Sequence, residues 1–492
     1  MSQRPEAAQI LVAGGGPAGA TAAAMLAREG FRVVLVERDR FPRYHIGESL
    51  LPSALDFLDL LGAREKIEQH GFQRKAGAHI EWGSQQWDLF FGELSGKNTY
   101  SFQVVRSEFD QCLMDHARQQ GATVLQGVEL RDLRFEGERP VAAILAPTGM
   151  ANDSWEIDFD YLVDASGRNG LLSTRYLRNR YYHEIFKNVA IWGYWKNTNR
   201  FDGKKDGAIA TISIPYGWIW AIPLHDGSMS VGVVLHKETF KERRAQLGIE
   251  QLYHRAIAES ATVSWLLETG ELTTELHAET DYSYACDRFA GPAYYIAGDA
   301  ACFLDPLLST GVHLAMMSGL LSSASIASVM RGEVSEQEAT SFYDRCYRRA
   351  YLRYLVFLSA FYNQYDGKES IFWMAQELTG QDAAEANLKK AFTNLMSGVE
   401  DWKDVRESAG THSYLLREMS TRVKENLAFR KDKTMIARHD ASGAKLRENG
   451  QFFDKVEGIS ILTPEDAVDG LYVVAEPRLG LARILKPEPV TG

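Results

Sequence analysis

The sequence predicts an α/β (α+β) protein, and three observations indicate this fold class. The chain opens with a short apolar strand at Ile10, "ILVA", then a glycine turn, a helix of small residues and a second apolar strand, "RVVLVE"; this order is typical of a βαβ unit. A second buried strand, within "AYYIAGDAA", leads much later into the long apolar helix "HLAMMSGLLSSASIASVM". Between the two, segments such as "GAIATISIP" and "SMSVGVVLH" alternate like strands of a mixed or antiparallel sheet.

These elements divide the chain into three expected regions. We expect the two apolar βα patterns to build one Rossmann-like domain interrupted by insertions, and the alternating segments to build an inserted, mixed β-sheet domain for a substrate. The aromatic-rich remainder is expected to be mainly helical. The Rossmann-like domain takes residues 1–75, 100–180 and 280–332, the β-sheet domain takes 76–99 and 181–279, and the helical C-terminal region takes 333–492.

Composition excludes several classes of protein. The chain has 492 residues, of which 45% are hydrophobic and 24% charged, which suits two or three domains with large cores. Its net charge of -11 argues against nucleic acid as a partner, because phosphates attract a basic surface. The apolar run near the N-terminus is too short for a secretory segment or a membrane span. The cysteines lack metal-ligand spacing, so we expect free thiols and no metal site. Free thiols suit a reducing compartment, so the expected location is the cytoplasm. The cysteines are Cys112, Cys286, Cys302 and Cys346.

The glycine turn after the first strand carries a dinucleotide-binding pattern. Gly14, Gly16 and Gly19 form G-x-G-x-x-G between a strand and a helix, and Glu37 closes the second strand. The first glycine permits the tight turn, the second lets a pyrophosphate approach the helix N-terminus, and the third lets helix and strand pack closely. Glu37 would accept a hydrogen bond from a ribose hydroxyl. The alternative is an ordinary glycine turn.

A second candidate ligand group lies at the end of the late strand. Asp299 follows "YYIAG", at the carboxyl edge where open α/β sheets bind ligands. Its carboxylate could accept a hydrogen bond from a ribityl or ribose hydroxyl, although an acidic loop residue is often merely solvated.

Together these elements resemble the flavin-binding domain of FAD-dependent aromatic monooxygenases. "VVRSEFD", with Arg106, and "LVDASGRNG", with Asp164 and Gly167, stand at the intermediate positions of that superfamily. The resemblance implies FAD, rather than NAD, as the cofactor.

Within that superfamily, three further motifs are similar to those of the flavin-dependent halogenases. They are "FQRKAG" from Phe72, "WIWAIP" from Trp218 and "FLDPLLSTGVHLA" from Phe303, and "YHIGESLLP" from Tyr44 accompanies them. The form F-x-x-K-x-G resembles the branch that acts on phenols, pyrroles and related electron-rich rings. The resemblance runs to about residue 360 and implies these cofactor contacts: Gly14, Gly15, Gly16, Ala18, Gly19, Glu37, Glu48, Ser49, Arg106, Asp299, Pro306 and Val312.

Lys75 is the candidate catalytic residue. Alternation around "KAGAHIEW" predicts a strand whose polar face starts at Lys75, and a lysine in isolation is usually a solvent-exposed charge. The resemblance implies instead that Lys75 passes an electrophilic halogen to the ring, either by hydrogen bonding hypohalous acid or as a haloamine. An amine whose pKa responds to burial suits both versions.

A candidate halide site precedes the long apolar helix. The "STG" triplet leads into a helix expected to begin near Val312 or His313, and its free N–H groups favour an anion; a plain helix cap is the alternative. The resemblance assigns chloride to Thr310 and Gly311. Tryptophan halogenases carry glutamate directly before the triplet, whereas this chain has Leu308, and this departure favours a more nucleophilic substrate such as a phenol.

Trp218 and Trp220 lie two positions apart, so both belong to one face of a strand together with Ile222. They are either two core side chains or a wall that keeps an organic substrate away from the oxidised flavin while halide enters.

The function implied by the resemblance is FADH2-dependent halogenation, through a flavin C4a-hydroperoxide, hypohalous acid and Lys75, of a phenolic precursor in secondary metabolism. It needs O2, chloride or bromide, and a separate flavin reductase. Two alternatives remain: an aromatic monooxygenase (hydroxylase), and a halogenase that acts only on a phenol or pyrrole tethered to a carrier protein, which could dock on the aromatic helix 351–362. His45, His79 and His313 lie near the motifs, but none is assigned as a base.

Overall fold

The first strand of the chain lies in the middle of a largely parallel sheet. The computed structural model describes residues 4–83, 85–91, 98–363, 462, 464 and 467–484. In this part of the chain a six-stranded sheet has the order β18-β19-β11-β1-β2-β7, parallel except at β18. Its apolar central strands are buried on both faces, as a parallel sheet requires. The bounds are β1 Ile10–Ala13, β2 Val33–Glu37, β7 Thr123–Gln126, β11 Tyr161–Asp164, β18 Ala290–Gly291 and β19 Tyr294–Ile296.

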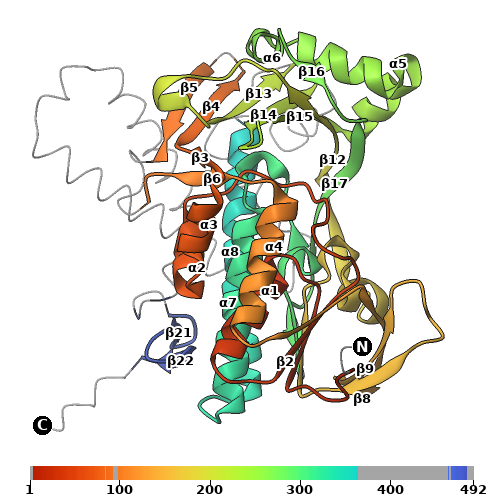
Figure 1. The fold of residues 1–492 in the computed structure, drawn as a ribbon, viewed down its shortest axis with the longest axis vertical. Helices are drawn as coiled ribbons and strands as arrows, with labels where there is room; N and C mark the ends of the chain where they lie inside the picture. Colours follow the sequence, from red (N-terminus) through yellow and green to blue (C-terminus); the bar gives the residue numbers. More distant parts are fainter. Residues whose placement is uncertain are drawn as a thin grey trace, which may run out of the picture.

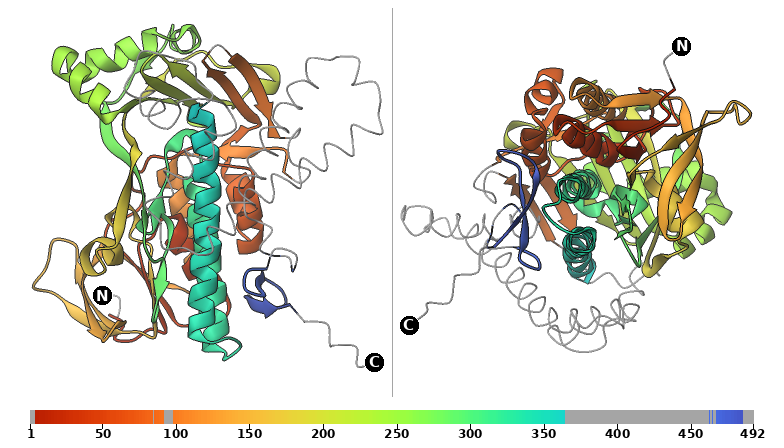
Figure 2. Two further views of the ribbon diagram at one scale, coloured as in Figure 1. Left: turned by 180° about the vertical axis from the view of Figure 1, so that it is seen from behind. Right: turned by 90° about the horizontal axis from the view of Figure 1, so that it is seen from below.

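Four helices stand side by side along this sheet (Figures 1 and 2). α1 packs against both α4 and α7, and α8 packs against α7. Gly319 of α7 permits the close crossing with α1, because a methyl group there would lie 2.7 Å from the carbonyl oxygen of Ala18. The bounds are α1 Pro17–Arg28, α4 Arg106–Gln119, α7 Gly311–Met330 and α8 Glu336–Asn363; the shorter α2 Ser53–Leu61 and α3 Arg64–His70 lie nearby.

α7 is the one described helix whose length and apolarity would allow it to cross a membrane. Inside the protein, however, 94% of its apolar window is buried. It is therefore a core helix of this fold, and its all-round apolar surface is explained by neighbours on every side.

A second, nine-stranded sheet is built by the described residues above the first. Its order is β20-β17-β12-β15-β14-β13-β4-β5, and β16 pairs with β12. All its pairs are antiparallel except β13 with β4, so the sheet is mixed and the predicted fold class is confirmed. The bounds are β4 Gly77–Trp82, β5 Gln85–Phe90, β12 Arg180–Lys196, β13 Ile209–Ile214, β14 Gly217–Pro223, β15 Met229–His236, β16 Glu271–Leu272, β17 His277–Cys286 and β20 Cys302–Phe303.

The two faces of this sheet serve different cores. On β14, Trp218, Trp220 and Ile222 belong to the main core, whereas Ile219 and Ala221 belong to a second core. That second core is covered by α5 (Lys237–Ala258) and α6 (Ala261–Leu266). The period of two along β14 thus directs both tryptophans to one side, as the alternation predicts.

The predicted strand through Lys75 is wrong in one respect. The strand breaks at Ala76: Lys75 ends β3 (Gln73–Lys75), which pairs with β6 (Ser101–Gln103) in a separate two-stranded sheet. Lys75 therefore starts no polar face of β4. Its side chain is only 2% exposed, because β3 turns it inward beneath the second sheet.

The remaining described elements lie at the edges. β8 (Val128–Glu136), β9 (Arg139–Pro147) and β10 (Trp155–Asp158) form a three-stranded antiparallel sheet. Of the expected helical region 333–492, the structure describes α8 and a hairpin of β21 (Leu471–Val474) and β22 (Gly480–Arg483), and most of the rest lies outside the described residues. All four cysteines are free thiols, as predicted.

Candidate active site

The two large sheets enclose a cavity of about 710 Å³, a size typical of cofactor sites. It is lined from the β1–α1 turn, the segment before α2, the start of α4, strands β12 and β14, and the start of α7. These predicted site residues line it: Gly14, Gly16, Ala18, Glu37, Glu48, Ser49, Arg106, Trp218, Trp220, Asp299, Pro306, Thr310, Gly311 and Val312. Gly15, Gly19 and Lys75 lie behind this lining.

The glycine turn depends on two glycines for its packing and leaves a third open toward the cavity. Gly14 has a positive φ of 111°, and a methyl group there would lie 2.1 Å from the carbonyl oxygen of Ala165. A methyl group on Gly19 would lie 1.9 Å from the carbonyl oxygen of Gly14, which confirms its packing role. Gly16, by contrast, meets only a distal atom of Arg43 at 3.5 Å. The open side of Gly16 and the N-terminus of α1 can thus receive phosphate oxygens.

Glu37 is held at the expected ribose position. Its Oε2 accepts a 2.8 Å hydrogen bond from the N–H of Gly15, and its Oε1 accepts one of 2.9 Å from the N–H of Asp39. Both bonds fix the carboxylate at the end of β2, where it lines the cavity. Each oxygen keeps a further lone pair for a ligand hydroxyl.

Arg106 supports the cavity rather than pointing freely into it. Its guanidinium donates to Asp110 at 2.9 and 3.1 Å and to the carbonyl oxygens of Ile46 and Gly47 at 2.9 and 3.1 Å. These bonds hold the segment that carries Glu48 and Ser49. Arg106 is therefore a positioning residue that also gives the wall a positive charge.

Asp299 and Asp164 play different parts at the carboxyl edge of the first sheet. Asp299 lies in the turn that follows β19 and lines the cavity, and burial raises its pKa. Asp164 accepts hydrogen bonds from the N–H groups of Ser166 and Leu172 at 3.1 and 2.7 Å. It shapes the loop in which Gly167, with a φ of 64°, lines the cavity.

The start of α7 opens into the same cavity. Thr310 precedes the helix with no side-chain cap bond, so the plain capping alternative is not observed, and the helix begins at Gly311. Apart from its own helix backbone and chain neighbours, no atom of the described residues lies within 4 Å of the position that a methyl group on Gly311 would take. No acidic residue occupies the first turn of α7. The N–H groups here are available to an anion.

The two tryptophans of β14 form one wall of the cavity. The ring centroids of Trp218 and Trp220 lie 5.9 Å apart, and Trp192 of β12 lies 6.4 Å from Trp220. Gly232 of β15 faces Trp220 across the sheet, and a methyl group there would lie 2.0 Å from the indole ring. Glycine at this position thus makes room for the indole.

Lys75 does not line the cavity, but its amine contacts Ser49, which does. Its Nζ donates hydrogen bonds to Ser49 Oγ at 2.7 Å and to the carbonyl oxygen of Leu50 at 3.0 Å, and lies 5.3 Å from the centre of the Phe91 ring. Burial lowers the pKa of Lys75 to about 7, since none of its contacts with described residues is a carboxylate that would hold the charge. The solvent-exposed alternative is therefore wrong.

A hydrogen-bonded network that ends on the buried carboxyl group of Glu48 is not evident from the sequence. Tyr194 donates a 2.7 Å hydrogen bond to Glu48, Tyr44 lies 3.0 Å from Tyr194, and Trp192 donates to Tyr44. Burial raises the pKa of Glu48 to about 7. The signal for Trp192 and Tyr194 was present in "AIWGYW", which has the same two-residue spacing as "WIW".

The three histidines near the motifs have different surroundings. His79 Nδ1 lies 2.7 Å from Asp88, and His313 Nδ1 lies 2.7 Å from Ser53; neither lines the cavity. His45 does line it, and burial lowers its pKa to about 4, so it is neutral near pH 7. No general base is assigned.

The aromatic helix 351–362 belongs to α8. Where its side chains are described, Tyr351, Tyr354, Leu355 and Leu358 are at most 5% exposed and pack in the main core. This half of the segment is core rather than a docking surface.

Comparison with known proteins agrees with this arrangement. The model of the tryptophan halogenase family matches residues 9–99 and 92–408. A tryptophan 2-halogenase of Chondromyces crocatus is 43% identical over 509 aligned positions, covering 98% of this chain and 95% of that protein. The flavin-dependent halogenase armH2 of Armillaria mellea is 40% identical, covering 77% of each chain.

Two solved structures share the fold. The myxobacterial chondrochloren halogenase CndH, described as a variant of FAD-dependent halogenases, matches with a TM-score of 0.72 and 34% identity, over 82% of this chain and 93% of that one. The flavin-dependent halogenase CmlS matches with a TM-score of 0.72 and 29% identity, over 86% and 79%.

Proposed function

The chain belongs to the flavin-dependent halogenases matched by the tryptophan halogenase family model, and we propose that it chlorinates a phenolic or comparably electron-rich aromatic compound. It is an FAD-dependent enzyme, and halide and O2 are the co-substrates of its family. Membership in this family decides between the halogenase and the hydroxylase alternatives in favour of the halogenase.

The cavity residues fit FAD. The N-terminus of α1, opened by Gly16, would hold the pyrophosphate, Glu37 would hold the adenosine ribose, and Asp299 would hold the ribityl chain. Glu48, Ser49, Pro306 and Val312 would surround the isoalloxazine ring. When bound, reduced FAD and O2 supply the two-electron oxidation that converts a halide ion into hypohalous acid.

Chloride would bind at Thr310 and Gly311. The start of α7 offers N–H donors, an unobstructed Gly311 and no acidic side chain in the first turn. A helix N-terminus attracts an anion through its partial positive charge. Thr310 and Gly311 also line the cavity. A halide bound there would therefore lie beside the isoalloxazine ring.

The observation that carries the proposal is the buried amine of Lys75 behind the cavity wall. With a pKa of about 7, both of its protonation states are accessible near neutral pH. The ammonium can donate a hydrogen bond to hypohalous acid. The neutral amine can attack the chlorine of hypochlorous acid, which breaks the O–Cl bond and gives a chloramine and water. Either form would deliver electrophilic chlorine to a ring carbon, which then loses its proton.

Trp218 and Trp220 would act as a wall between the flavin cavity and the organic substrate. Their indoles line the cavity and are 1% and 5% exposed. A tightly packed wall admits halide and releases a small neutral acid but excludes an aromatic substrate. The tryptophans then prevent direct oxygenation of the substrate and take no chemical part.

The phenolic substrate is favoured by Leu308, an apolar residue that packs on the main core directly before Ser309. It offers no carboxylate to stabilise a cationic ring intermediate, so the substrate itself must be strongly nucleophilic. A second candidate is an indole, because the relative that is 43% identical is a tryptophan 2-halogenase. Tethering of the substrate to a carrier protein is a further possibility for the phenolic case.

A separate flavin reductase would supply FADH2 by diffusion, and the four free cysteines favour a cytoplasmic setting. The test is to supply purified enzyme with FAD, a reductase, NADH, O2 and chloride, together with free phenols, carrier-tethered phenols and pyrroles, and tryptophan. The chlorine isotope pattern of each product is read by mass spectrometry. Chlorinated phenol supports the proposal, chlorinated tryptophan alone supports the second candidate, and replacement of chloride by bromide measures halide preference.

A further inference from the structure

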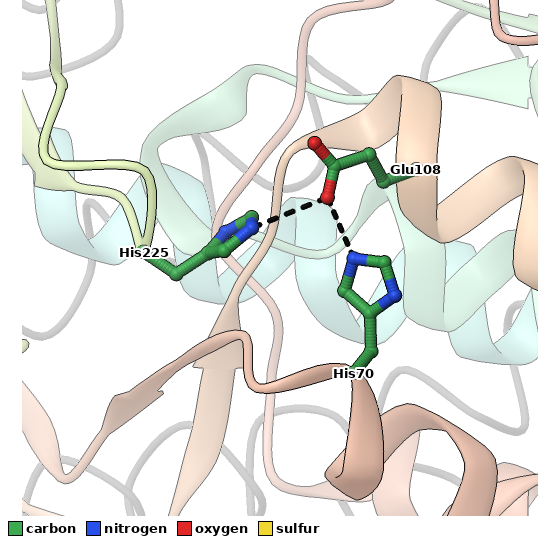
Figure 3. A group of neighbouring side chains, drawn as sticks. All are labelled: His70, Glu108 and His225. Carbon is green, nitrogen blue, oxygen red and sulfur yellow. Dashed lines mark hydrogen bonds and ion pairs between the residues drawn. The ribbon is translucent and has the colours of Figure 1, made fainter.

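Three side chains from distant parts of the sequence converge beside the β3 segment. Figure 3 shows the carboxylate of Glu108 between the rings of His70 and His225. Glu108 Oε2 lies 2.6 Å from His70 Nε2 and 3.2 Å from His225 Nε2. The three ligand atoms all lie within 4.8 Å of one another.

Each side chain comes from a different element. His70 is the last residue of α3, Glu108 lies in the first turn of α4, and His225 follows β14. Phe72 holds both imidazoles: its ring stacks on His70 at 4.2 Å and meets His225 edge-on at 5.2 Å. The packing therefore aims both Nε2 atoms at the same carboxylate oxygen.

We propose that this group binds one Zn²⁺ ion. Two imidazole nitrogens and one carboxylate oxygen are a donor set typical of zinc sites that keep an open position for water. Zinc bonds of about 2.0–2.2 Å place neighbouring ligand atoms about 3.4 Å apart in a tetrahedron. The 3.2 Å separation is close to this value, the 2.6 Å separation has to open by side-chain rotation, and the two imidazole nitrogens lie within 4.8 Å of each other.

The surroundings suit a cation as well. All three side chains are partly exposed, so water can supply the remaining ligands. His225 Nδ1 is buried, so an ion can reach only Nε2, the nitrogen that faces Glu108. On the other ring, Cys112 Sγ lies 3.8 Å from His70 Nδ1 and can orient it from behind the ligand atom.

The ion would connect three segments that carry the active site. His70 precedes the β3 strand that ends at Lys75, Glu108 is two residues after Arg106, and His225 follows the strand of Trp218 and Trp220. The ion lies outside the cavity lining. Its role is therefore structural: it links the three segments and takes no part in the chemistry.

The experiment measures zinc in tag-free, FAD-loaded protein after incubation with ZnCl2 and removal of free metal. The variants are Glu108→Gln, which keeps the size and shape of the side chain but replaces one acceptor oxygen by an amide donor, and His225→Ala. The matched control is His254→Ala, an exposed histidine on α5. Far-UV circular dichroism and FAD content establish that each variant is folded.

We expect one zinc per chain in the wild type and the control, and its loss in both variants. Added zinc should raise the Tm of the wild type and the control only. Absence of zinc from the wild type, or equal zinc content in wild type and Glu108→Gln, overturns the proposal. If His225→Ala fails to fold, Glu108→Gln alone decides.

Discussion

Lys75 Nζ donates a 2.7 Å hydrogen bond to Ser49 Oγ, and Ser49, unlike Lys75, lines the large cavity. The lysine is thus one hydroxyl group away from the cavity, although it does not itself line it. This arrangement suits a relay in which a small oxidised halogen species passes from the cavity to the amine. The following predictions test its parts.

Burial of Lys75 should make the effect of Lys75→Met on stability depend on pH. The unfolded chain protonates Lys75 up to its ordinary pKa of 10.5, whereas the folded protein does so only up to about 7. Below pH 7 the folded protein carries the full cost of a buried ammonium, and this cost disappears as the pH rises to 10.5. The lowering of the Lys75 pKa from 10.5 to about 7 corresponds to about 5 kcal/mol of unfolding free energy, which the folded protein regains between pH 7 and pH 10.5.

Lys75→Met removes this cost. The unfolding free energy of the variant, relative to that of the wild type, should therefore be highest below pH 7 and decline toward pH 10.5. Urea unfolding of both proteins at several pH values measures the difference. A difference that is independent of pH would show that the amine is not desolvated.

Gly311→Ala should separate halide binding from folding. The added methyl group meets no atom within 4 Å, so the Tm should be unchanged or slightly higher, because alanine favours a helix. The methyl group would nevertheless stand where chloride is proposed to bind. A loss of about 1.4 kcal/mol of halide binding raises the KM for chloride about tenfold. Steady-state kinetics at varied chloride measure it, and an unchanged KM places the halide elsewhere.

Glu37→Gln should weaken FAD binding. The amide replaces one carboxylate oxygen by a donor, although the N–H groups of Gly15 and Asp39 both need acceptors. Loss of a hydrogen bond to a charged group costs about 1.5–3 kcal/mol, so the Kd should rise on the order of ten- to a hundredfold. Fluorescence titration with FAD measures it. Glu242→Gln, at an exposed position of α5, is the control and should not change the Kd.

Gly232→Ala should disturb the tryptophan wall. The new methyl group would overlap the indole of Trp220, and overpacking of this kind costs about 1–3 kcal/mol. We also expect fewer chlorinated products per FADH2 oxidised, and oxygenated products if the wall opens. In the double variant Gly232→Ala/Trp220→Phe, the smaller ring should recover part of the stability. Strictly additive losses in thermal unfolding would show that the two positions do not interact.

Short-range patterns in the sequence predicted much of the fold. Strands and helices around Gly14 and Gly311 follow local periodicity and turn chemistry, and the common face of Trp218 and Trp220 follows from the period of two. The glycine motif also located the cavity, because its residues act through backbone geometry within one turn.

Long-range contacts could not be predicted in this way. Alternation placed Lys75 at the start of a polar strand face, but the strand breaks at Ala76, and the partner Ser49 is 26 positions away. The bond between Tyr194 and Glu48 spans 146 positions, and that between His70 and Glu108 spans 38. Such pairs are set by the packing of whole elements, and no local spacing records them.

The most direct test of the account compares halogen transfer with flavin oxidation in Lys75→Ala. Wild type and variant receive the same FADH2, O2, chloride and accepted aromatic substrate, while oxygen uptake and chlorinated product are measured in parallel. The account predicts that oxygen uptake continues at the wild-type rate and that chlorinated product falls at least a hundredfold, on the order of the contribution of one positioned catalytic group. Chlorination at the wild-type rate in Lys75→Ala would contradict the role of Lys75.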